Sequence, residues 1–234
     1  MTNTPLLRRT DSLRLHDPAA QAVLVARWDL PSVSARTRAA EASLSAMPPA
    51  TGLLRYSLFV EIEGSALFHL SQWHNRDSLD AYVDAGYVGP KAAVDAASPE
   101  ISRAWRFLGE PVQNHVVADA PGDCIVIVRQ PVMMPDQAVA KSWVKTVIAA
   151  LRSDGGTPKG LFGAHFFSAY DGSAAINMAE WESADAHKAA LQPADFNPAG
   201  SIGLSNAWRR TRSHPGISPD HEVTRCRFYG SVEP

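Results

Sequence analysis

The stretch Thr51–Trp73, TGLLRYSLFVEIEGSALFHLSQW, returns 108 residues later as Lys159–Trp181, KGLFGAHFFSAYDGSAAINMAEW, with no gap in the alignment. The turn EGSA at 63–66 meets DGSA at 171–174, and a tryptophan ends both stretches. Further along, RFLG at 106–109 resembles RFYG at 227–230, now with an offset of 121. This shared order of features indicates a tandem duplication, in which the second copy carries extra residues before its last strand.

Each copy predicts the same four strands and two helices. Apolar runs at 22–30 and 123–132 have the length of strands, and a helix follows each, capped by Asp136 in the second copy. The acidic-Gly turn joins two further strands, because glycine accepts the positive φ of a tight turn. A second helix starts after each tryptophan, where Asn75 and Ser183 are suited to cap it. The RF-x-G segments supply the fourth strands.

The order β-α-β-β-α-β predicts an α+β fold of two ferredoxin-like repeats. Helices cover only one face of such a sheet, so its other face needs a second layer. Two copies in one chain can cover each other, sheet to sheet. We therefore expect an intrachain dimeric α/β barrel with a cavity between the sheets, built from domains at 20–118 and 119–234. Residues 1–19 are expected to be a flexible leader.

Composition disfavours several classes of protein. The net charge of −2 gives no electrostatic footprint for nucleic acid. No apolar run reaches the roughly 18 residues of a membrane span, and the first 20 residues lack the apolar centre of a signal peptide. We expect a cytoplasmic protein with Cys124 and Cys226 reduced and buried. The eight histidines show no metal-ligand spacing, so no metal is expected.

The most informative side chains lie on the strands that end in tryptophan. Asn177 and Trp181 are four residues apart and therefore share one face of their strand. An amide and an indole N–H beside an apolar wall would suit a planar aromatic ligand with a keto oxygen. Ordinary core packing is the alternative for both side chains. In the first copy, His69 and Trp73 hold these two positions, and His165 in the second copy is either a cavity base or a core histidine.

The strand-ending tryptophans, in LSQWH at 70–74 and MAEWE at 178–182, are each followed by a capped helix. In this the chain resembles the antibiotic biosynthesis monooxygenase family over nearly its whole length. Family members are ferredoxin-like units that pair into dimeric α/β barrels. Those that oxidise anthrones in aromatic polyketide pathways carry an Asn four residues before this Trp, as Asn177 and Trp181 do. His69 departs from that pattern, so the resemblance implies a working site in the second copy.

Other branches of the family imply other chemistry. Its haem-degrading members use a histidine about ten residues after the tryptophan, where this chain has Val83 and Leu191, so haem degradation is disfavoured. Tandem members of this length open angucycline rings with reduced flavin, but that resemblance rests on length and domain count and on no motif. The family's catalytic arginine comes from near the last strand. The arginines that meet this condition loosely are Arg103, Arg106, Arg209, Arg210 and Arg227.

The resemblance implies an oxygenase for a polycyclic aromatic polyketide or a related phenol, acting in antibiotic biosynthesis without a cofactor. Its partners would be that small molecule and oxygen, and the chain could form a homodimer. Asn177 and Trp181 would bind the substrate oxygen, while a histidine, His165 or else His69 or His187, would move protons. The expected substrate contacts are His69, Trp73, Phe167, His187 and Arg227.

Two alternatives remain from the sequence. One is an oxygenase of the angucycline type that uses reduced flavin to cleave a C–C bond. The other is a non-catalytic binding or stress-response barrel. The extra segment of the second copy, within residues 193–220, is expected to be either a lid over the cavity or an inert insertion.

Overall fold

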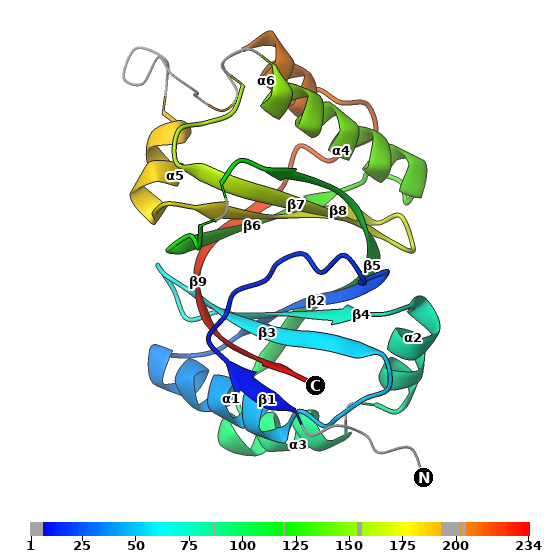
Figure 1. Cartoon of the computed structure of the whole chain (residues 1–234), viewed down its shortest axis with the longest axis vertical. Coiled ribbons are helices and arrows are strands. Elements are labelled where there is room, and N and C mark those ends of the chain that lie inside the picture. The colour runs from blue at the N-terminus through cyan, green and yellow to red at the C-terminus, as the bar shows by residue number, and fades with distance from the viewer. Residues whose placement is uncertain (1–6, 87, 119, 154–155, 193–201, 203–204) are drawn as a thin grey trace. The chain divides into compact units, whose positions relative to one another are not determined.

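The structure is a computed structural model that describes residues 7–86, 88–118, 120–153, 156–192, 202 and 205–234. Its contacts divide the chain into two compact units. Unit 1 consists of residues 1–108 and 226–234, and unit 2 of residues 109–225. Each unit is an α+β structure with an antiparallel sheet and three helices (Figure 1).

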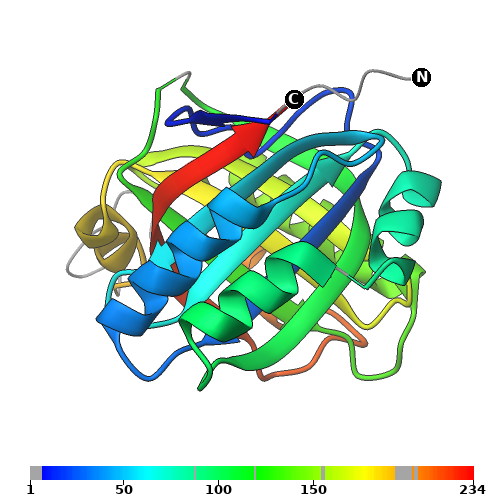
Figure 2. The ribbon, with the colours of Figure 1, turned by 90° about the horizontal axis from the view of Figure 1, so that it is seen from below.

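Unit 1 contains the first copy of the repeat. Its sheet has the strand order β1-β9-β3-β4-β2-β5. The elements wholly inside it are β1 (Arg8–Thr10), β2 (Ala22–Asp29), α1 (Val33–Ala46), β3 (Leu53–Glu61), β4 (Leu67–Trp73), α2 (Arg76–Asp84) and α3 (Val88–Ala97). Figure 2 shows α1 and α3 lying side by side across one face of this sheet.

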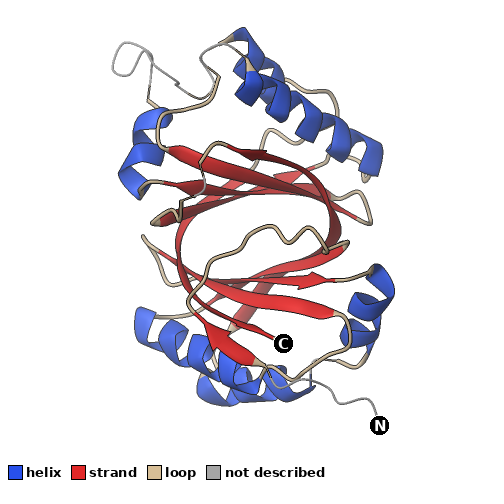
Figure 3. Cartoon of the chain, viewed as in Figure 1, coloured by secondary structure: helices blue, strands red, loops and turns tan. Residues whose placement is uncertain are grey.

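Unit 2 contains the second copy, and its sheet has the order β5-β7-β8-β6-β9. Its own elements are β6 (Cys124–Pro131), α4 (Gln137–Arg152), β7 (Leu161–Ala169), β8 (Ala174–Trp181), α5 (Ala184–Ala190) and α6 (Asn206–Arg212). The three helices lie on one side of the sheet (Figure 3). The predicted ferredoxin-like order of strands and helices is confirmed, with α3 and α6 added to the two expected helices of each copy.

Two strands belong to both units. The division falls inside β5 (Ser102–Val116) and inside β9 (Glu222–Glu233). Residues 226–232 of β9 pair with β3 of unit 1, while residues 109–116 of β5 pair with β7 of unit 2. Unit 1 therefore includes residues 226–232 of β9 from the second copy, and unit 2 includes residues 109–116 of β5 from the first. The repeat boundary expected at 118 and 119 lies just after β5.

The segment expected as a leader is structured from its middle onward. Arg8–Thr10 forms β1 and pairs antiparallel with residues 231–233 of β9. Leu15 is 1% exposed. Detaching this segment would break the pairing of β1 with β9 and expose Leu15 to water, so both contacts hold it in place.

Local sequence explains where the elements begin and turn. The side chains of Asn75 and Ser183 accept hydrogen bonds from backbone N–H groups in the first turns of α2 and α5, at 2.9 and 3.0 Å. Asp136 caps α4 in the same way, at 2.7 Å. Gly172, in the DGSA turn, has φ of 71°, a conformation that side chains with a Cβ disfavour. Among the described residues, no helix combines the length and apolarity needed to cross a membrane.

Candidate functional site

A cavity of about 520 Å³ lies inside unit 2, between its sheet and its helices. Its volume falls in the range of small-molecule sites. Asn177, Ala179 and Trp181 line it from β8, and α4, α6 and α5 close it from the other side. The apolar and aromatic part of the lining includes Val126, Val128, Trp143, Val147, Leu151, Leu161, Ala164, Ile202, Trp208 and Ile217.

This position differs from the expected cavity between two sheets. Residues alternate between the faces of a strand, so Asn177, Ala179 and Trp181 share one face, as predicted. That face turns out to be the one that the helices cover, since Trp143 of α4 packs edge-on against Phe166, the β7 partner of Asn177. The sequence placed the two residues together, and the packing of α4 decided which side they line.

Two polar atoms at the cavity are buried without a partner among the residues that the structure describes: Trp181 Nε1 and Asn177 Oδ1. Trp181 is 2% exposed. A buried indole N–H without an acceptor is costly, and so is a buried amide oxygen without a donor. One is a donor and the other an acceptor. A ligand hydroxyl offers the complementary pair, because it accepts through its oxygen and donates through its proton.

The other two tryptophans of the cavity do have partners. Trp143 Nε1 donates to the carbonyl oxygen of Thr211 at 3.2 Å, and Trp208 Nε1 donates to that of Gly156 at 3.2 Å. These bonds tie α6 to α4 and to the chain after it. Trp143 and Trp208 therefore have an evident structural role, whereas the polar end of Trp181 has none among the described residues.

His187 of α5 stands beside Trp181, with the two rings 4.9 Å apart and edge to face. Arg225 Nε donates to His187 Nδ1 at 3.0 Å. Because Nδ1 accepts this bond, the proton of the neutral ring lies on Nε2. His187 lines the cavity, as predicted for a substrate contact. Arg225, which orients it, was not expected from the sequence.

His165 and Phe167 lie on the opposite face of the sheet. His165 Nε2 is 3.4 Å from Glu180 Oε1, and its Nδ1 is 3.1 Å from Asn114 Oδ1. Glu180 alternates with Ala179 and Trp181 and so points away from the cavity. Neither His165 nor Phe167 is part of the cavity lining. Strand alternation therefore separates them from Asn177, and the proton-transfer role expected of His165 has no support from this geometry.

In unit 1, aromatic side chains occupy positions that correspond to smaller, non-aromatic residues at the cavity of unit 2. The register of β2, β3 and β4 places Trp28, Tyr56 and His69 where unit 2 has Gln130, Ala164 and Asn177. The His69 ring lies 4.9 Å from that of Trp28 and 5.3 Å from that of Tyr56.

Burial, with a smaller effect from the charge of Arg103, lowers the pKa of His69 to about 3. His69 is therefore a neutral ring packed among aromatic neighbours.

Trp73 also differs from its counterpart. Its Nε1 donates to Ser71 Oγ at 2.9 Å, and its ring lies 4.9 Å from that of Tyr82. The predicted substrate contacts His69 and Trp73 are thus both packed inside unit 1. Arg227 belongs to unit 1 as well and is exposed on β9.

No family model matches the chain, and no curated protein sequence matches it. Solved structures do match. An anthrone oxidase-like protein has a TM-score of 0.70 at 10% identity, over 97% of this chain and 95% of that chain. Proteins named as monooxygenases from Lactobacillus acidophilus NCFM and Fusobacterium nucleatum have TM-scores of 0.53 and 0.54, both at 8% identity. These cover 89% and 92% of this chain and 94% of each of theirs.

The chain has the fold of these monooxygenase-like proteins. The resemblance to the antibiotic biosynthesis monooxygenases is thereby confirmed at the level of the fold. Identities of 8 to 10% leave the reaction to be argued from the site itself.

Within this monooxygenase-like fold, the expected arginines do not line the cavity, but Arg212 of α6 does, on its exposed side with His221 and Pro219. Arg212 lies in the extra segment of the second copy, which is evident from the sequence alone. The sequence could not single out this arginine, because its place at the cavity depends on the packing of α6 against α4. Residues 193–201, 203 and 204 of that segment, where a lid or an inert insertion was expected, lie outside the described residues.

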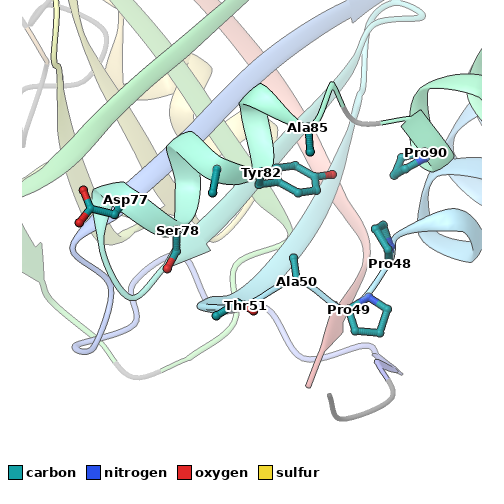
Figure 4. A pocket seen from close by; sticks show the side chains of 10 residues that line it. Pro48, Pro49, Ala50, Thr51, Asp77, Ser78, Tyr82, Ala85 and Pro90 are labelled. Carbon is teal, nitrogen blue, oxygen red and sulfur yellow. The ribbon is translucent and has the colours of Figure 1, made fainter. Parts of the chain in front are cut away.

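A second pocket, of about 580 Å³, lies in unit 1 between the loop after α1 and helices α2 and α3 (Figure 4). Pro48, Pro49 and Thr51 line it from the loop, and Asp77 and Tyr82 line it from α2. Most of these residues are exposed, and none of the described ones carries a buried polar atom without a partner. The pocket therefore lacks the feature that marks the cavity of unit 2.

Proposed function

We propose that the protein is an oxygenase that oxidises a planar, polycyclic phenol of the anthrone type in the cavity of unit 2. The observation that carries this proposal is the pair of unpartnered atoms, Trp181 Nε1 and Asn177 Oδ1, in an otherwise apolar cavity. The fold is shared with an anthrone oxidase-like protein, which supports the same reaction class.

The chemistry needs little from the protein beyond binding and charge stabilisation. An anthrone CH₂ group is acidic enough to lose its proton to water, and the resulting enolate carries its charge on the keto oxygen. The Trp181 N–H stabilises that oxygen inside an apolar cavity, where a hydrogen bond to an anion is strong. Asn177 binds a neighbouring hydroxyl through Oδ1 and holds the ring plane in place.

Oxygen then reacts with the enolate carbon to give a peroxide anion, which takes a proton back from water and becomes a hydroperoxide. Loss of water from that carbon leaves a carbonyl, so one O₂ converts CH₂ into C=O and H₂O. No step in this sequence requires an external electron donor. The aromatic walls formed by Trp143, Trp208 and their apolar neighbours would exclude water while the enolate forms.

Reduced flavin is the competing proposal, for a ring-opening reaction. The experiment that separates the two is oxygen uptake by the purified protein with dithranol, a tricyclic hydroxyanthrone, with and without added reduced flavin. We expect uptake above the spontaneous rate without flavin, and loss of that excess in Asn177→Ala. Uptake that appears only with reduced flavin would support the rival, and binding without any uptake would support a non-catalytic binding protein.

A further inference from the structure

The strand-ending tryptophan has a hydrogen-bond acceptor in one copy and none among the described residues in the other, although it ends the equivalent strand in both. Trp73 and Trp181 are equivalent in the repeat and in strand register, each pairing with the first strand of its copy. Both rings are buried, at 0% and 2% exposure. The indole of Trp73 has an acceptor and the indole of Trp181 has none among the described residues.

The difference lies two residues earlier on the strand. In unit 1, Ser71 Oγ accepts the Trp73 N–H at 2.9 Å. The equivalent position of unit 2 is Ala179, which lines the cavity and has no hydroxyl. Residues two apart on a strand share a face, so a serine there can reach the ring of the strand-ending tryptophan, as Ser71 demonstrates.

We propose that Ala179 is the specificity-determining residue of the cavity. By lacking an acceptor, it reserves the Trp181 N–H for an oxygen of the ligand, so that the cavity prefers a hydroxylated aromatic to the bare hydrocarbon. This rests on the proposed function only in taking the cavity of unit 2 as the ligand site. A serine at this position would accept the indole proton internally and remove that preference.

The size of the effect follows from what the ligand must replace. In the natural protein, a ligand oxygen that meets the Trp181 N–H removes a buried unpaired donor. In Ala179→Ser the donor is already paired, so the ligand hydroxyl gains little and gives up its bonds to water. One hydrogen bond of ordinary strength corresponds to about a tenfold change in affinity.

The test compares two probes that differ by one hydroxyl group, 1-naphthol and naphthalene, by equilibrium dialysis with the full chain. We expect the natural protein to bind 1-naphthol more tightly, and Ala179→Ser to lower this preference about tenfold. Ala179→Cys is the matched control, because it adds one heavy atom of poor acceptor strength and should keep most of the preference. The indole N–H resonance of Trp181 in a ¹⁵N-labelled sample should shift on 1-naphthol binding and should already be shifted in Ala179→Ser.

Three results would overturn the proposal: no preference in the natural protein, an unchanged preference in Ala179→Ser, or an equal loss in Ala179→Cys. None of these measurements involves oxygen or turnover. A protein that binds 1-naphthol as expected but does not oxidise dithranol would keep the inference about Ala179 and remove the proposed reaction. Ser71→Ala serves as a second control and should leave the binding of both probes unchanged.

Discussion

At the scale of single residues, Asn177 should matter more for turnover than His69, its counterpart in the repeat. Asn177→Ala removes a polar contact from the cavity, whereas His69→Ala leaves the cavity of unit 2 intact. Without the contact that holds the ring plane, the reacting CH₂ group is misplaced, so we expect at least a tenfold lower rate of dithranol oxidation for Asn177→Ala. Equal rates for the two folded variants would contradict the assignment.

The two tryptophans offer a second pair of residues. Trp181→Phe keeps most of the apolar area and removes only an N–H that has no described protein partner, so activity should fall with little change in melting temperature. Trp73→Phe removes the donor to Ser71, so it should cost ~1–3 kcal/mol of stability and leave the rate unchanged. A fully active but clearly less stable Trp181→Phe enzyme would show that this ring is only part of the core.

His69 should make the protein sensitive to acid. Its pKa is about 3 in the folded protein because the ring is buried, below the ordinary 6.5. Between these two values the unfolded chain binds more protons here, so the free energy of unfolding falls as the pH falls from 6.5 toward 3. His69→Gln should make this decline less steep in urea unfolding at pH 7, 5 and 4. Identical pH dependence in both proteins would refute the assignment.

At the scale of elements, the equivalent glycines of the two acidic-Gly turns, Gly64 and Gly172, should differ in how well they tolerate a side chain. Gly172 has φ of 71°, and a Cβ there would lie 2.6 Å from the backbone nitrogens of Asp136 and Gln137, where α4 starts. A Cβ on Gly64 would meet the Glu61 side chain, which can move. We expect Gly172→Ala to cost ~1–3 kcal/mol in chemical denaturation and Gly64→Ala much less. Similar losses would mean that the contact with α4 carries no strain.

At the scale of the whole molecule, the shared strands β5 and β9 should prevent either half of the sequence from folding alone. A fragment of residues 1–118 lacks β9, which lies between β1 and β3 of unit 1. A fragment of residues 119–234 lacks β5 and leaves β7 of unit 2 with one unpaired edge. We expect both fragments to be unfolded or aggregated by circular dichroism and sedimentation. A stable, monomeric fragment would show that the missing strand is dispensable.

Features that depend on neighbouring residues could be predicted from the sequence. The 108-residue repeat, the caps at Asn75 and Ser183 and the acidic-Gly turns all follow from local patterns, and they predicted the strand and helix order of both units. The pairing of Asn177 with Trp181 on one strand face also follows, because alternation in a strand is a local property.

Which face of β8 the helices cover was settled by tertiary packing, and the register between β7 and β8 put His165 on the face away from Asn177. Contacts between distant segments also placed Arg225 on His187, brought α6 to the cavity, and gave each unit a strand from beyond its own repeat. These outcomes depend on which side chains fill the space between sheet and helices. Ser71 and Ala179 differ by one oxygen in equivalent places, and only the packed structure shows that Ser71 Oγ accepts the Trp73 N–H while Trp181 Nε1 has no partner among the described residues.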